Sequence, residues 1–181
     1  MDLNLGKLTV NGNVATDWYA PNGNRYIAIE NEGSYTMHHI YVGITKLSLK
    51  PSNTGFGYKA EFWCDSTVQA MIESESYSLW LTEDIVANRS IDGYKQIVTL
   101  RLQNFDMENY GASKVNAKVS MTLSNGMVLE SGIVSYSMQE MVESISANVD
   151  NFSADQIKAV QAMLADHDLN WNIDALLNWT E

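Results

Sequence analysis

The sequence predicts a mainly β (α+β) fold: an antiparallel, immunoglobulin-like β-sandwich with two or three short C-terminal helices packed on it. Three observations predict this fold. Apolar residues alternate with period two from about residue 25 to residue 136, turn residues recur every dozen or so positions, and the period changes to 3.6 at Ser137. We therefore expect one domain, with a β-sandwich body over residues 1–136 and a helical C-terminal extension of the same domain over residues 137–181.

Two segments show the strand alternation most clearly. The even-numbered residues from Phe56 to Cys64 are apolar and share one predicted face, whereas Lys59, Glu61 and Trp63 share the other. The segment Val115–Leu123 alternates between apolar and polar residues without a fault. Further strands are expected over residues 25–30, 39–49, 77–82 and 94–103.

Local signals predict a hairpin and a short helix within this body. Asn125-Gly126 follows the second segment and precedes a new apolar run, and this dipeptide supplies the positive φ angles of a type I′ turn. Asp65 is placed to cap a short helical pattern formed by Val68, Met71 and Ile72.

The last 45 residues predict three short helices. Apolar residues recur at helical spacing from Met138 to Ile145, and Ser153 with Gln156 forms a capping box that begins the second helix. A last helix is expected to carry Ile173, Leu176 and Leu177. Because short amphipathic helices are not stable alone, we expect them to pack on the end or side of the sandwich or against a neighbour.

Charge and composition exclude several classes of function. The chain has 181 residues with 11 Lys and Arg against 22 Asp and Glu, a net charge of −11, which disfavours nucleic acid and anionic membranes as partners. One cysteine excludes an internal disulfide and a CxxC zinc pair. No stretch approaches the roughly 18 apolar residues of a membrane span, so no membrane insertion is expected.

The motifs that resemble cofactor or metal sites are weak. Gly55–Ala60 fits G-x-G-x-x-A but is predicted to begin a strand rather than a helix, which a dinucleotide site requires. The acidic loop Asp166–Asp174 resembles a calcium loop, but Trp171 and Leu177 stand where glycine and a bidentate carboxylate are needed. We therefore expect a polar loop and no cofactor.

No catalytic constellation can be identified. His38 and His39 are adjacent in a strand and face opposite sides, so they cannot chelate one metal. Cys64 is predicted to face inward, where cysteine is usually a small apolar residue, although a Cys–His pair stays open at this stage. We expect no enzyme and no metal site.

Two tryptophans are the candidate ligand-binding residues. If the strand neighbours of Trp63 and Trp80 face the core, both indoles point outward. They could then form a flat platform for sugar rings or lie in a protein contact. The alternative is that the C-terminal helices cover them. We favour the covered arrangement, because amphipathic helices need a surface on which to pack.

Several segments resemble a known kind of module. The runs at residues 44–52, 55–62, 79–83, 100–106 and 115–123 resemble a C-terminal module of large secreted or surface proteins of anaerobic gut bacteria. The similarity extends over roughly residues 40–164. It implies an exported, multi-domain parent and a non-enzymatic role, and it carries no catalytic residue or ligand. Since no signal peptide follows Met1, we expect an excised part of a longer exported chain, located outside the cell or at its surface.

The leading hypothesis is a structural or interaction module of a bacterial secreted or surface protein, with a protein or glycan partner. One alternative is a carbohydrate-binding module that uses Trp63 and Trp80. Another is a subunit of a larger assembly such as a virion, with the helical tail docked on a neighbour.

Overall fold

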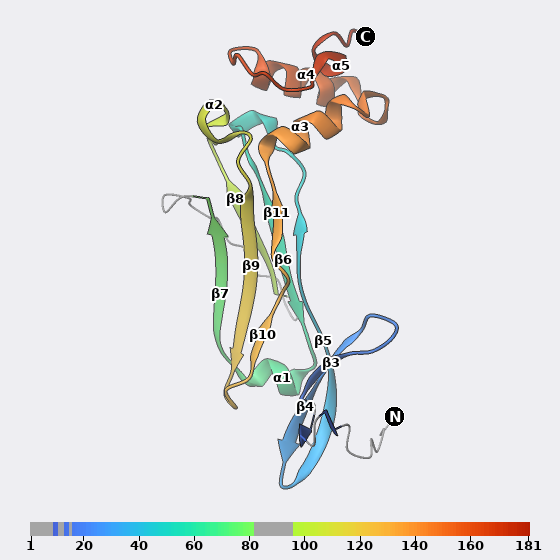
Figure 1. Ribbon diagram of the computed structural model, residues 1–181, viewed down its shortest axis with the longest axis vertical. Coiled ribbons are helices and arrows are strands. Elements are labelled where there is room, and N and C mark those ends of the chain that lie inside the picture. Colours follow the sequence, from blue (N-terminus) through green and yellow to red (C-terminus); the bar gives the residue numbers. More distant parts are fainter. Residues whose placement is uncertain (1–8, 11–12, 15, 82–95) are drawn as a thin grey trace.

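The computed structural model describes residues 9–10, 13–14, 16–81 and 96–181, and these form antiparallel sheets with short helices (Figure 1). One sheet has the strand order β3-β4-β5-β6-β8. Its strands are β3 (Asp17–Tyr19), β4 (Arg25–Asn31), β5 (Ser34–Lys46), β6 (Phe56–Trp63) and β8 (Gln96–Leu102). The predicted mainly β, antiparallel class with short helices is thus confirmed.

The second sheet is built around β9 (Val115–Leu123). This strand pairs with β7 (Ile72–Trp80) on one side and with β10 (Val128–Glu130) and β11 (Val134–Tyr136) on the other. A separate pair is formed by β1 (Thr9–Val10) and β2 (Asn13–Val14).

The two larger sheets share one apolar core, and the predicted alternation accounts for it. Every second residue of β9 is buried from Val115 to Leu123, and the apolar face of β6 is buried from Phe56 to Phe62. A hairpin turn at Asn125-Gly126 leads into β10 as predicted, but the predicted type I′ geometry is wrong, because Gly126 has a positive φ of 83° and Asn125 does not. The hairpin and both strands are therefore confirmed.

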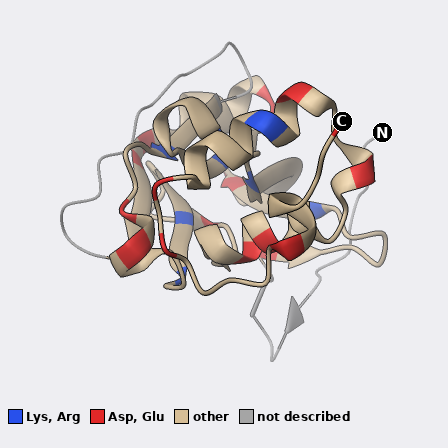
Figure 2. Cartoon of the chain, turned by 90° about the horizontal axis from the view of Figure 1, so that it is seen from above, with Lys and Arg blue, Asp and Glu red and all other residues tan. Residues whose placement is uncertain are grey.

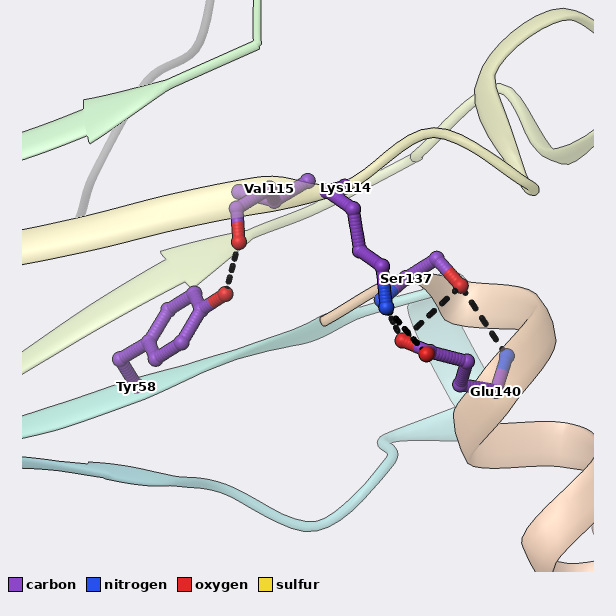
Figure 3. Close-up of polar contacts among 5 residues, drawn as sticks. All are labelled: Tyr58, Lys114, Val115, Ser137 and Glu140. Carbon is purple, nitrogen blue, oxygen red and sulfur yellow. Dashed lines mark hydrogen bonds and ion pairs between the residues drawn. The ribbon is translucent and has the colours of Figure 1, made fainter. Parts of the chain in front are cut away.

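Two buried tyrosines connect the sheets in opposite directions. Tyr58 of β6 donates its hydroxyl hydrogen to the carbonyl of Val115 in β9 (Figure 3), and Tyr136 of β11 donates to the carbonyl of Gly57 in β6. Burial raises the pKa of both phenols, so both remain donors. Gly57 also permits the close pairing of β6 with β8, since a Cβ there would lie 2.1 Å from the Leu100 carbonyl oxygen.

Two strands begin five residues earlier than predicted. β5 begins at Ser34 instead of residue 39, after a tight turn in which Glu32 and Gly33 have φ angles of 50° and 80°. β7 begins at Ile72 instead of residue 77. Both early segments carry mostly polar or exposed residues, and backbone pairing with β4 and β9 forms them with little of the apolar burial that alternation detects. Residue 82 of the strand predicted over 77–82 and residues 94–95 of the strand predicted over 94–103 lie outside the described residues.

The predicted helices are confirmed, but two of their residues lie outside them: Ile72 begins β7 instead of continuing the short helix after Asp65, and Ile173 is the N-cap of the last helix. Asp65 accepts hydrogen bonds from two backbone N–H groups of α1 (Ser66–Ala70). A capping box of Ser137 and Glu140 begins α3 (Met138–Ser146), and the predicted box of Ser153 and Gln156 begins α4 (Ala154–Leu164). The remaining helices are α5 (Asp174–Leu177), α2 (Met107–Tyr110) and the 3-10 turns η1 (Pro51–Asn53) and η2 (Val149–Asn151).

The C-terminal helices cover one end of the two-sheet body and not its outer face (Figure 1). α4 contacts η1, which directly precedes β6, and Trp171 packs against Gly111 after α2. Phe56 is the end of β6 that lies next to these helices, and Trp63 lies seven residues further along the strand, a distance of about 23 Å. Trp80 of β7 is 40% exposed. The favoured prediction that the C-terminal helices bury both indoles is therefore wrong. The apolar stripes of α3 and α4 instead join the core at the open end between the sheets.

Candidate binding face

The outer face of the five-stranded sheet carries a continuous series of aromatic rings, here called the aromatic row. It comprises Trp18 of β3, Tyr26 of β4, His39 and Tyr41 of β5, and Trp63 of β6. Neighbouring ring centroids are 4.5–6.3 Å apart along the whole series. The row crosses four strands.

Strand register explains why these rings meet. Trp18 lies opposite Tyr26, Tyr26 lies opposite His39, and Tyr41 lies opposite Trp63. Cross-strand neighbours share one face of a sheet, and each such aromatic pair contributes roughly 0.2–1 kcal/mol. The row therefore also stabilises the pairing of the strands that carry it.

At one end of the row lie two rings that are nearly parallel to each other. Tyr41 and Trp63 are within 17° of parallel, with centroids 6.3 Å apart. A Cβ on Gly43 would lie 2.4–2.9 Å from the hydroxyl oxygen and two ring carbons of Tyr41, so this side chain occupies the space directly above Gly43. The absence of a side chain at Gly43 allows the ring to lie along the sheet, where 38% of Tyr41 is exposed.

The rings of His39 and Trp63 make a T-shaped contact, with planes at 90° and centroids 4.5 Å apart, which holds the indole in place. Polar groups lie beside the pair. Glu61 is opposite Gly43, and its carboxylate is 2.8 Å from the ammonium of Lys59. This hydrogen bond raises the pKa of Lys59. The face therefore combines two apolar ring surfaces with an ion pair of zero net charge, which offers both hydrogen-bond donors and acceptors.

The structure does not bring the two predicted tryptophans together. Trp63 belongs to the five-stranded sheet, whereas Trp80 ends β7 in the other sheet. Trp80 is 40% exposed and Trp63 is partly buried within the row. No single platform uses both indoles.

Sequence reasoning identified Trp63 but missed the four other rings of the row. The sequence signal that could have revealed the pairing of these rings is the hairpin turn at Glu32-Gly33. With that turn, paired residue numbers in β4 and β5 sum to 65, which places Tyr26 opposite His39. An alternation pattern gives faces but no partners, so the row was not visible in the individual strands.

The two histidines face opposite sides, as predicted. His38 is buried, and its Nδ1 lies 2.6 Å from Asp65 Oδ2, while His39 joins the outer row. Burial opposes ionisation of Asp65, but hydrogen bonds from His38 and from Val68 and Thr67 N–H outweigh it and keep the pKa of Asp65 below its usual value. This pair joins β5 to the start of α1.

Cys64 is not placed as a nucleophile. Its sulfur lies 3.9 Å from Gln69 Oε1, and burial raises the pKa of the thiol to about 12. A nucleophilic cysteine needs the opposite shift. His167 is 3.0 Å from Glu108 Oε1 at the helical end.

The two weak motifs have structural roles. Gly55–Ala60 runs into β6, as predicted, and not into a helix. In the loop Asp166–Asp174, Asn172 N–H donates to Glu143 and the following Ile173 is buried. Across the described ranges, no three His, Cys, Asp or Glu side chains are grouped so that they could hold a metal ion.

Comparisons with protein-family models, curated proteins and solved structures find no match to this chain. None of the helices in the described part of the chain is long and apolar enough to cross a membrane.

Proposed function

We propose that this chain is a non-enzymatic binding module of a bacterial secreted or surface protein, and that it binds saccharides through the Tyr41–Trp63 end of the aromatic row. The observation that carries the proposal is the nearly parallel ring pair above Gly43. The sequence resemblance and the low content of charged residues, 18%, support the extracellular setting. We further propose the immunoglobulin-like sandwich class for the two-sheet body, since such folds commonly present binding faces.

The chemistry of the ring pair suits a pyranose. The C–H face of a sugar ring is apolar and packs on an aromatic face, while its hydroxyl groups require hydrogen-bonding partners at the rim. Lys59 and Glu61 lie beside Tyr41 and supply a donor and an acceptor. An exposed aromatic surface with polar groups at its edge is the arrangement that this recognition needs.

The test is retention of the purified chain in native gels containing soluble polysaccharides, together with a glycan array. We expect retention by at least one glycan. Trp63→Ala and Tyr41→Ala should each weaken it about tenfold or more, because stacking on an aromatic ring contributes roughly 1–3 kcal/mol in comparable ligand contacts.

Trp80→Ala is the matched control, because it removes an exposed indole from the other sheet. It should bind glycans like the unmodified chain. Equal losses in Trp80→Ala and Trp63→Ala would contradict the assignment to this face, and silence on both the array and the gels would refute saccharide binding.

A further inference from the structure

A second candidate site lies at the joint between the two-sheet body and the C-terminal helices, away from the aromatic row. A pocket of about 570 Å³ opens between the loop that follows β5, the end of β11, and helices α3 and α4. Its apolar lining comprises Leu49, Pro51, Tyr136, Met141, Ile145 and Phe152. Small-molecule sites in proteins typically measure about 300–1,000 Å³ and are lined mainly by such side chains.

The charged side chains of this pocket are not equivalent. Lys46 lies 4.9 Å above the ring of Tyr136, and among the described residues no ion pair is recorded for it. Glu140, in contrast, is engaged by Lys114 and by Ser137 in the capping box (Figure 3). Asp155 stands in the first turn of α4, where the helix dipole favours an anion. Glu140 also interacts with Lys46 electrostatically, which helps to lower the pKa of that carboxyl, and Asp155 has no ion pair among the described residues. Among the described lining residues, Lys46 is the one cation.

We infer that this pocket binds a small amphipathic carboxylate, with its head group at Lys46 and its apolar tail against α3 and α4. The acidic surface around the pocket makes it possible to measure what Lys46 contributes to binding. Residues 137–181 contain eight acidic residues and one lysine, and Figure 2 shows acidic positions spread over this end of the molecule. Such a surface repels anions at long range, so selective binding of a carboxylate would show that the pocket attracts it locally.

The experiment is a calorimetric titration of the full chain with octanoate, decanoate, decanol and decyltrimethylammonium. We expect decanoate to bind more tightly than decanol or decyltrimethylammonium, which carry a decyl chain but no carboxylate. Affinity should rise by up to about fourfold for each CH₂ added between octanoate and decanoate, since each buried CH₂ favours binding by a similar factor.

Two pairs of variants locate the site. Lys46→Met should weaken decanoate binding about tenfold and leave decanol binding unchanged, because a charge-assisted contact is lost and the apolar stem is kept. Lys118→Met, on β9 outside the pocket, is its control. Ala159→Phe fills the pocket from α4 and should abolish binding of both compounds, whereas Ala162→Phe, an exposed position on the same helix outside the lining, should not.

Equal decanoate affinity in Lys46→Met, or unchanged binding in a folded Ala159→Phe, would overturn the inference. Circular dichroism of each variant establishes that it is folded. Tighter binding of decyltrimethylammonium than of decanoate would refute the carboxylate assignment, and no binding of any probe would refute the site. None of these results depends on saccharide binding at the aromatic row.

Discussion

Arg25 connects the strands of the aromatic row to the opposite sheet, and its replacement should destabilise the protein. The side chain is 8% exposed. Its Nε and Nη2 donate to the two carboxylate oxygens of Asp17 in β3 at 2.9 and 2.7 Å, and its Nη1 donates to the carbonyl of Glu130 in β10 at 2.7 Å. One guanidinium therefore joins β4, β3 and β10.

The expected cost follows from these contacts. Removing one partner of a fully buried pair costs about 3–5 kcal/mol, because the other charge is left unpaired. The Asp17 side chain is 33% exposed and can be partly rehydrated, so for Arg25→Met we expect a loss of about 2–4 kcal/mol in the free energy of unfolding. For a chain of this length that lowers the melting temperature by about 5–15 °C.

Urea denaturation at pH 7, followed by tryptophan fluorescence, measures this loss. Lys118→Met is the control, since its exposed ion pair with Glu130 should contribute about 1 kcal/mol or less. Arg25→Lys should recover only part of the stability, because an ammonium cannot make the two-pronged contact with Asp17. A loss below 1 kcal/mol in Arg25→Met would refute the role of this residue in joining the sheets.

Three further predictions concern other sites. The lowered pKa of Asp65 means that its ionised form stabilises the fold above the usual aspartate pKa of about 3.9, and that this contribution is lost as the pH falls through the folded pKa. Asp65→Ala, which also loses the cap of α1, should therefore cost about 1 kcal/mol at pH 7 and less at pH 3 in urea titrations. A cost that does not change with pH would contradict this. Gly57→Ala should destabilise the fold by about 1–3 kcal/mol or more, because its Cβ meets the backbone of Leu100. Gly43→Ala displaces only the Tyr41 side chain and should mainly affect glycan retention. Equal melting temperatures for the two variants would count against this difference. Cys64, with its pKa near 12, should react with a disulfide reagent at pH 8 far more slowly in the native chain than in 6 M guanidinium, and comparable rates would show that the thiol is accessible and ionised.

The proposed sites differ in how much could be predicted. Outward orientation of Trp63 followed from period-two alternation in β6, but its partners came from strands far apart in the sequence. The Lys46 pocket gave no sequence signal, because its walls come from a loop, a strand end and two helices that meet only in the folded chain.

The sequence by itself determined the local elements of this protein. Alternation from Val115 to Leu123, the turn at Asn125-Gly126, and the caps at Asp65 and Ser153 depend on residues that are neighbours along the chain, so their physics is local. Tertiary structure alone decided which strands pair, that Tyr41 lies beside Trp63, and that the helices cover the end of the body. These outcomes depend on register and on the competition between alternative apolar surfaces, which involve residues distant in the sequence.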